Sequence, residues 1–373
     1  NAGGVERSLV DILKHMDYTK YAVDLLLLED TGDYASELPP EVNVLFRDLH
    51  NTYGGFALSV RRCIAARDWM CLRVLGLRTL FLLRKIWGSR ALKSAATLLL
   101  GEHHYDCVIG FRPGICADLA GYSVKAKRRI TWWHHGEFYV DRVAYGAMCS
   151  RMDAVAVVSR ACREMLQDHL PELADKLICV PNMLDASAIL QKVEHTPYAK
   201  NDLCIVSVGR FAPEKHFENI VPAAKALQAM NLAFMWHIVG DGSERARVEM
   251  LITENGLKDY VILEGSKTNP YPYMKYADLF VHPSYIESQG LTVLEAMALG
   301  VPCVVTKSRG PCEFIEDGIN GLLTEQSPES LAEKVLSILT DKTLYQSIKE
   351  NTVCPEQFAP DRVMKQIEAL IDG

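Results

Sequence analysis

Short runs of apolar residues recur along the chain, and each is followed by a segment whose apolar positions repeat at helical spacing. Runs of this length are typical of parallel strands that are buried on both faces. Nine of them predict strands at Cys107–Ile109, Ile130–Trp133, Ala154–Val158, Leu177–Val180, Leu203–Val208, Ala233–Val239, Val261–Leu263, Leu279–Val281 and Cys303–Val305. The alternation of strands and helices predicts an α/β protein with doubly wound sheets, and nine strands are too many for one such sheet.

The 373 residues are enough for two or three domains. The stretch 181–201 holds two prolines and several polar residues, and it separates the two series of strands. We therefore predict a first domain at 1–185 and a second at 200–350. The chain opens with N-A-G-G-V-E-R-S-L-V. Because a Gly-Gly loop that enters a helix normally follows a strand, we expect a first strand upstream of Asn1.

The composition, 49% hydrophobic and 23% charged, excludes a disordered chain and a fibre. The net charge of −7 argues against a protein that coats nucleic acid over its whole surface. Eleven cysteines without CxxC spacing favour free thiols in a reducing cytosol. Since no apolar run reaches the about 18–20 residues that cross a bilayer and no signal-peptide pattern is present, we expect a cytoplasmic protein.

The segment P-S-Y-I-E-S-Q-G-L-T-V-L-E-A-M-A-L-G, residues 283–300, carries the most informative pattern. A strand leads into a loop, and the following helix leaves unpaired N–H groups near Gly290 and Leu291, where a phosphate can bind. Glu287 in the loop and Glu295 in the helix flank that place, so their carboxylates can accept hydrogen bonds from a sugar on one side and a ribose on the other. The alternative is a solvated loop charge and an ordinary helix-surface residue.

A second loop, S-V-G-R-F-A-P-E-K-H-F, directly follows the strand at 203–208. Arg210 and Lys215 are placed beyond the carboxyl end of that strand, where they can neutralise a diphosphate leaving group. The alternative is a surface ion pair with Glu214. The chain contains no D-x-D sequence to hold Mg²⁺. We therefore expect the cationic pair to replace a metal, with no metal or other cofactor required.

Two further loops end strands. In V-G-D-G-S-E-R, Gly240 and Gly242 permit close backbone approach or a positive φ, although such a loop can equally be a plain turn. In I-T-W-W-H-H-G-E-F, a neutral imidazole of His134 or His135 can bond a sugar hydroxyl or an acceptor. A metal site lacks ligands at matching spacing, and a structural histidine remains the other alternative.

The segment 283–305 resembles the E-x7-E motif of the family 4 retaining glycosyltransferases, which have the GT-B fold of two Rossmann-like domains facing a cleft. The longer string from Asn269 is similar to members that build bacterial capsule and surface polysaccharide. The family commonly has E-G-F-G or E-G-x-P where this chain has E-S-Q-G, with Ser288 and Gln289.

The resemblance implies a role for each matching residue. Glu287 would contact donor-sugar hydroxyls, Glu295 the ribose, and Arg210 with Lys215 the diphosphate, while His135 would be the cleft histidine with Glu137 beside it. The remaining donor contacts would come from Gly3, Gly4, Gly240, Gly242, Ser266, Gly290 and Leu291, with the base near 265–267. The last helix, within 356–373, would cross back onto the first domain.

The resemblance also implies the reaction. A hexose or N-acetylhexosamine would move from a nucleotide diphosphate sugar, with UDP-sugar favoured, to a lipid-linked or saccharide acceptor with retention at the anomeric carbon. Two alternatives stay open. A nucleotide-sugar epimerase or phosphorylase would share the phosphate loops, and a non-catalytic GT-B binding subunit would share the fold.

The segment 61–93 contrasts with the acidic remainder of the chain. It has nine basic residues and one acid, a net charge of +8, so the other residues carry −15. Bases interleaved with aromatic and aliphatic residues predict a helix on an anionic membrane surface, which would make the protein peripheral on the inner face of the cell membrane. The alternatives are a helix packed on its own domain and, without a recognisable motif, nucleic-acid binding.

Overall fold

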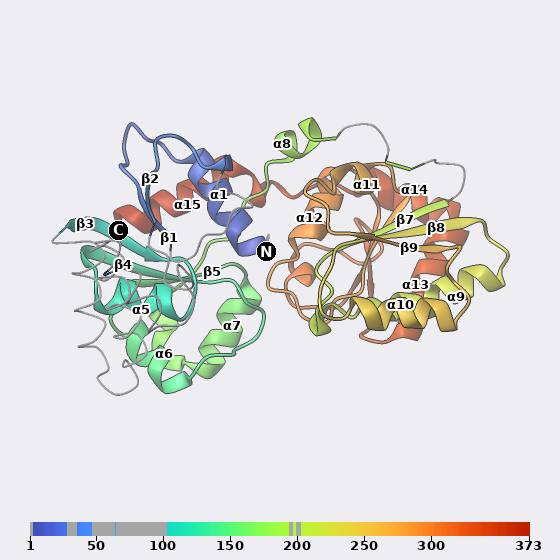
Figure 1. Ribbon diagram of the computed structural model, residues 1–373, viewed down its shortest axis with the longest axis horizontal. Coiled ribbons are helices and arrows are strands. Elements are labelled where there is room, and N and C mark those ends of the chain that lie inside the picture. Colours follow the sequence, from blue (N-terminus) through green and yellow to red (C-terminus); the bar gives the residue numbers. More distant parts are fainter. Residues whose placement is uncertain (1–2, 28–35, 47–63, 65–102, 194–196, 199–202) are drawn as a thin grey trace.

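The computed structural model describes residues 3–27, 36–46, 64, 103–193, 197–198 and 203–373. The chain forms two lobes side by side, each with a parallel sheet, and its N-terminus lies at the boundary between them (Figure 1). Segment 61–93 lies outside the described residues except for Ile64, so its proposed membrane role stays a prediction. The expected strand upstream of Asn1 also stays a prediction.

The first lobe is built on a four-stranded sheet in the order β3-β4-β5-β6. Its strands are β3 (His104–Gly110), β4 (Lys125–Trp133), β5 (Ala154–Val157) and β6 (Leu177–Cys179). All three strand pairs are parallel. The whole of β5, the sequence A-V-A-V, is buried, as expected for a strand covered on both faces.

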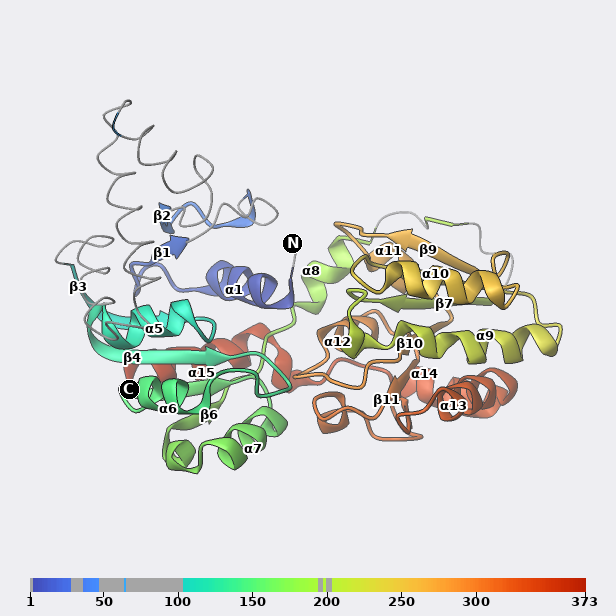
Figure 2. The same ribbon diagram turned by 60° about the horizontal axis from the view of Figure 1, so that its bottom comes forward.

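Helices cover this sheet and supply one hydrophobic core. They are α1 (Gly4–His15), α5 (Ile115–Tyr122), α6 (Arg142–Cys149), α7 (Arg160–His169) and α15 (Pro360–Asp372). Helix α15 ends the chain, yet it packs in the first lobe, where Val363 and Ile367 belong to the core (Figure 1). A separate parallel pair, β1 (Asp24–Leu27) and β2 (Asn43–Phe46), lies on the same side of the lobe as α1 (Figure 2).

The second lobe holds a six-stranded parallel sheet in the order β12-β11-β10-β7-β8-β9. Its strands are β7 (Leu203–Val208), β8 (Phe234–Val239), β9 (Val261–Gly265), β10 (Leu279–His282), β11 (Cys303–Thr306) and β12 (Leu322–Thr324). The chain runs outward from β7 to β9 and then returns to build the other half, starting from β10. The strand order therefore reverses between β7 and β10, and the crevice at such a point is where open α/β sheets bind ligands.

Helices lie on both faces of this sheet and enclose two cores. They are α9 (Ile220–Ala229), α10 (Arg245–Glu254), α11 (Tyr271–Lys275), α12 (Leu291–Ala298), α13 (Pro328–Thr340) and α14 (Lys342–Asn351). The linker between the lobes carries α8 (Ala186–Gln191). Short 3-10 helices occur at Pro171–Lys176, Pro213–Lys215, Phe217–Asn219, Pro311–Glu313 and Glu356–Phe358.

The structure confirms the fold class, two Rossmann-like α/β domains, and each of the nine predicted runs coincides with a strand. Sequence reasoning did not predict β1, β2 and β12, although these strands are no shorter than β6, which it did predict. Within the described ranges, no helix is both long and apolar enough to cross a membrane.

Candidate functional site

The loops that follow β7 and β10 meet at the point where the strand order reverses. Leu279 and Phe280 of β10 pair in register with Ile205 and Val206 of β7. The chain leaves β7 toward Arg210 and Lys215, and it leaves β10 toward Glu287. Residues that are more than 70 positions apart in the sequence are thereby brought to one edge of the sheet.

Glu287 lies at the centre of a buried ion-pair cluster. Its Oε1 accepts a hydrogen bond from Lys215 Nζ at 2.5 Å and lies 2.7 Å from His282 Nε2. The Glu287 side chain is 10% exposed. Burial by itself raises the pKa of a carboxyl group, but Lys215 and His282 together hold the pKa of Glu287 well below its usual range. Glu287 is therefore a fixed negative charge at any ordinary pH.

Arg210 contacts a different carboxylate. Its Nη2 lies 3.2 Å from Oε1 of Glu214, and its side chain is 73% exposed. This is the surface ion pair that the sequence left open as an alternative. Such an exposed pair contributes little stability, so Arg210 can exchange its partner at low cost.

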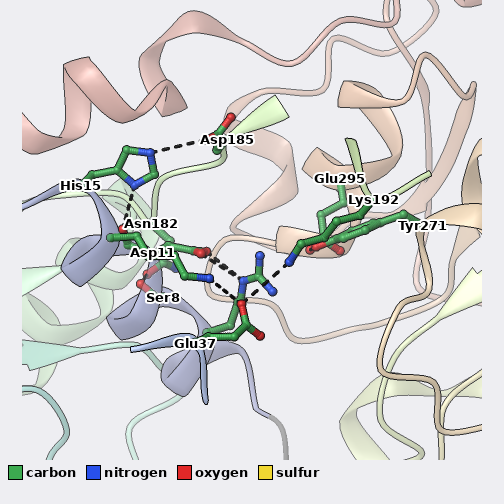
Figure 3. A network of polar contacts seen from close by, with 11 residues as sticks. Ser8, Asp11, His15, Glu37, Asn182, Asp185, Lys192, Tyr271 and Glu295 are labelled. Carbon is green, nitrogen blue, oxygen red and sulfur yellow. Dashed lines mark hydrogen bonds and ion pairs between the residues drawn. The ribbon is translucent and has the colours of Figure 1, made fainter. Parts of the chain in front are cut away.

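Glu295 has quite different surroundings. Its Oε1 accepts a hydrogen bond from the Tyr271 hydroxyl at 3.2 Å. Burial raises the pKa of Glu295 to about 7, and the Tyr271 hydroxyl and the charge of Arg7 only partly oppose this rise. Figure 3 shows Glu295 beside Tyr271 and Lys192, facing the residues of α1. Close to neutral pH, this carboxyl group is divided between its two protonation states.

The N-termini of two helices converge between the lobes. A β-carbon at Gly4, the first residue of α1, would lie 3.7 Å from Cδ1 of Leu291, the first residue of α12. Gly290 caps α12 with a φ of +87°, and a β-carbon there would lie 2.8 Å from Pro311 Cγ, so both the backbone and the space require glycine. Two positive helix ends therefore face the same small region, which favours an anion.

The loop after β8 packs tightly on the loop after β7. Gly240 has a φ of +148°, and a β-carbon there would lie 1.8 Å from the Gly209 carbonyl oxygen. A β-carbon at Gly242 would lie 2.3 Å from the Phe211 carbonyl oxygen. The Gly240 amide donates to the Gly265 carbonyl at 2.9 Å, which places the exposed Ser266 at the same strand edge. The glycines thus serve close backbone approach as well as positive φ.

His134 and His135 directly follow β4, on the facing side of the cleft. Three buried ring nitrogens have no hydrogen-bond partner. They are Nδ1 and Nε2 of His134 and Nε2 of His135. Burial lowers the pKa of His134 to about 3. Burial, helped by the charges of Arg112 and Arg210, also lowers the pKa of His135. Both imidazoles are therefore neutral at neutral pH.

The histidine loop meets the Glu287 loop directly. A β-carbon at Gly136 would lie 3.1 Å from the Glu287 carbonyl carbon. Beside this contact lies a cavity of about 740 Å³, lined from the first lobe by Glu137 and His169 and from the second by Glu287 and Arg309, among others. Within the ranges described, no three His, Cys, Asp or Glu side chains gather as a metal site would require.

The structure brings Lys215 and Glu287 into contact, and it places His135 and Glu137 across the cleft from them. It pairs Arg210 with Glu214 instead of bringing it to Glu287. Sequence reasoning missed three residues of the site: His282, Tyr271 and Arg7. The signals were present, because His282 is a polar residue at the end of an apolar strand and Arg7 follows the Gly-Gly loop.

Two family models match successive parts of the chain. The model for Glycosyltransferase Family 4 matches residues 2–188, and the model for Glycosyl transferases group 1 matches residues 189–353. The chain is 33% identical over 147 residues to the lipopolysaccharide core biosynthesis glycosyltransferase LpsE of Rhizobium meliloti, covering 39% of this chain and 42% of that protein. It is 28% identical over 176 residues to N-acetyl-alpha-D-glucosaminyl L-malate synthase of Bacillus anthracis, covering 46% of each. The matched stretches thus span less than half of these relatives.

Solved structures show the same fold. Anabaena HepE in complex with UDP-glucose matches with a TM-score of 0.70 at 18% identity, covering 100% of this chain and 96% of that one. The pneumococcal O-GlcNAc transferase GtfA in complex with UDP and GlcNAc matches with a TM-score of 0.60 at 20% identity, covering 71% of this chain and 56% of that one. At these identities the likeness shows the architecture of the chain.

Proposed function

The chain belongs to glycosyltransferase family 4 and has the GT-B fold, and from this premise we propose that it is a retaining, metal-independent glycosyltransferase. It moves a hexose or N-acetylhexosamine from a nucleotide diphosphate sugar, with UDP-sugar favoured, to a saccharide or lipid-linked acceptor. The product belongs to bacterial surface polysaccharide. The names of LpsE and of the UDP-bound solved structures support this choice of reaction and donor.

One observation carries the proposal: Lys215 and Glu287 meet at the strand-order reversal, beside the converging helix N-termini. During transfer, the bond between the anomeric carbon and the diphosphate breaks, a bond to the acceptor oxygen forms on the same face, and UDP and a proton are released. The leaving diphosphate gains negative charge. Lys215, Arg210 and the amides at Gly4, Gly290 and Leu291 stabilise that charge without a metal.

The other residues bind and orient the donor. Ionised Glu287 accepts hydrogen bonds from sugar hydroxyls, and Glu295 accepts from the ribose. The neutral imidazole of His135 has an unpartnered Nε2, which accepts a hydrogen bond from the transferred sugar or the acceptor. Gly240, Gly242 and Ser266 border the nucleotide, and Gly3 borders the phosphates.

A donor panel tests this proposal. Thermal shift with a set of nucleotide diphosphate sugars identifies the donor, because a bound ligand stabilises the folded state by mass action. Transfer from that donor is then measured in the parent protein and in Glu287→Ala and Lys215→Ala. We expect each substitution to abolish transfer while the protein stays folded. Lys127→Ala, at an exposed pair with Asp106, is the matched control. Full transfer in either site variant contradicts the assignment.

We also propose that the basic segment 61–93 docks the protein on the inner face of the cell membrane, near a lipid-linked acceptor. Sedimentation with liposomes tests this directly. We expect pelleting with anionic vesicles of phosphatidylglycerol and little with neutral phosphatidylcholine. Equal pelleting with both contradicts an electrostatic dock.

A further inference from the structure

Gln289 occupies the place where this chain departs from the E-G-F-G sequence common in its family. It lies two residues after Glu287, between β10 and α12, and is only 2% exposed. Both polar atoms of its side-chain amide bond the backbone of one linker residue, Asn182. Its Oε1 accepts from the Asn182 backbone N–H at 2.8 Å, and its Nε2 donates to the Asn182 carbonyl at 3.0 Å. A phenylalanine at this position has neither a donor nor an acceptor to offer.

The contact continues from Asn182 into the first lobe. The Asn182 Oδ1 accepts a hydrogen bond from the hydroxyl of Ser8, in helix α1, at 2.6 Å. Ser8 and Asn182 are 3% and 6% exposed. Figure 3 shows the two side chains meeting where α1 approaches the linker. Three buried polar side chains therefore join α1, the linker and the loop that carries Glu287.

The network is buried, and each of its bridging hydrogen bonds is formed. A satisfied buried network fixes one arrangement, because moving any member leaves its partners without hydrogen bonds in a place that water does not reach. The two bonds from Gln289 also set the orientation of its amide, since the oxygen must face the Asn182 N–H and the nitrogen the Asn182 carbonyl.

The Glu287 loop has little freedom to absorb a displacement of Gln289. A β-carbon at Gly310 would lie 2.6 Å from the Gln289 backbone nitrogen, and Gly136 abuts Glu287 from the other lobe. The thiol of Cys162, in α7, donates to the carbonyl oxygens of His135 and Ser288 at 3.4 and 3.8 Å. Loss of the Gln289 contacts would therefore displace the backbone of Glu287.

We infer that Gln289 is a positioning residue of this enzyme. Through Asn182 and Ser8 it clasps the donor loop to helix α1, so that the juxtaposition of the two lobes sets the geometry in which Glu287 meets the sugar. This inference rests on the proposed function and adds to it a residue that acts through Glu287 and the lobe contact. The buried side-chain amide of Gln289 already has its partners at Asn182, so we assign it no direct contact with the donor or the acceptor.

The test compares Gln289→Met with the parent protein. Methionine has a similar length but lacks the amide, and Gln228→Met is the matched control, because Gln228 also donates to a backbone carbonyl, that of Gly256, on the exposed surface of α9. Hydrogen exchange of the Asn182 amide reads the clasp without any turnover. The turnover rate kcat, the Michaelis constant for the donor found in the panel, and the Kd for UDP read its consequence.

We expect exchange at Asn182 to rise about tenfold or more in Gln289→Met, as for the loss of two buried hydrogen bonds. We expect kcat to fall about tenfold while the Kd for UDP changes less than about threefold, because Gln289 acts on the sugar-binding loop. Ser8→Ala shifts both readouts less in the same direction, and Ser8→Thr, which keeps the hydroxyl, restores them.

Two results would overturn the inference. Unchanged exchange at Asn182 in Gln289→Met means that the clasp does not hold the linker. Faster exchange with an unchanged kcat means that the clasp is structural and does not position Glu287. Absence of transfer in the parent protein would instead refute the proposed function, and the exchange measurement would still judge the clasp.

Discussion

Glu287 and Glu295 are eight positions apart in one motif, yet their carboxyl groups lie in opposite electrostatic surroundings. Glu287 touches Lys215 and His282, and these partners hold its pKa well below the ordinary value against the effect of burial. Glu295 has a tyrosine hydroxyl as its hydrogen-bond partner, and burial raises its pKa to about 7. The same residue type is thus a permanent charge in one place and a titrating group in the other.

The difference shows that the motif spacing determines where the two carboxyl groups lie, whereas the surrounding fold determines their charge. The motif spacing puts one carboxylate in the loop and the other in the helix, but the charge state depends on residues from other segments. Lys215 arrives from the loop after β7, and Arg7 acts on Glu295 from the opposite lobe. For the proposed reaction, a constant charge suits the contact with sugar hydroxyls, whereas the ribose contact depends on pH.

The largest expected effect comes from removing the cation beside Glu287. Lys215→Met leaves a buried carboxylate without its main partner, so we expect stability to fall by about 2–4 kcal/mol, and donor transfer to be lost. Because the pKa of Glu287 is lowered in the folded state, its contribution to stability is present above its unfolded pKa and is lost as the pH falls. Urea unfolding of the parent and the variant at several pH values measures the loss of stability and its pH dependence.

Lys127→Met is the control for that comparison, because Lys127 pairs with Asp106 at 2.7 Å and both side chains are more than four-fifths exposed. We expect it to leave stability almost unchanged, because both charges are already solvated. Equal losses in Lys215→Met and Lys127→Met would mean that the Glu287 cluster is no stronger than a surface ion pair.

A smaller effect separates Glu295 from Glu287 by pH. Ionised Glu295 accepts a stronger hydrogen bond than the protonated acid, so we expect the affinity for UDP in the parent, relative to Glu295→Gln, to rise about threefold to fivefold from pH 6 to pH 8. Taking the ratio cancels the titration of UDP itself. Calorimetric titration at each pH measures it, and a ratio that stays flat across this range contradicts a carboxyl group that titrates near 7.

The pH dependence of stability that Glu295 causes has the opposite sign to that caused by Glu287. Because the pKa of Glu295 is about 7 in the folded state and lower in the unfolded chain, the folded state binds the extra proton between these values. Stability therefore decreases as the pH rises toward 7, and Glu295→Gln removes that decrease.

The smallest expected effect comes from the tyrosine beside Glu295. The Tyr271 hydroxyl lowers the pKa of Glu295, so Tyr271→Phe moves the pH midpoint of UDP binding upward by about half a unit, the equivalent of one modest hydrogen bond. The same calorimetric series measures it. A midpoint that moves downward would contradict the hydrogen bond as the cause.

The sequence was most informative where the signal was local. The apolar runs located nine strands, and Gly290 before a helical segment located the N-terminus of α12. The E-x7-E resemblance located the two glutamates. The sequence did not predict the contact between Lys215 and Glu287, because that contact depends on the pairing of β7 with β10.

The least predictable contacts cross between the lobes. Arg7 acts on Glu295, and Gln289 holds Asn182 and through it Ser8, over separations of more than 100 residues. The sequence marked Gln289 only as a departure from a familiar string. Polar side chains of this kind show no periodicity, so only their packing reveals which partners they meet.

The most direct test is a titration of the glutamate carboxyl groups by NMR, with ¹³C-labelled glutamate and with Glu287→Gln and Glu295→Gln to assign the two signals. We predict that Glu295 titrates with a midpoint near 7, while Glu287 stays ionised down to the lowest pH at which the protein remains folded. A Glu287 signal that titrates in the ordinary glutamate range, or a Glu295 signal that does so, would contradict the division of roles between these two carboxylates.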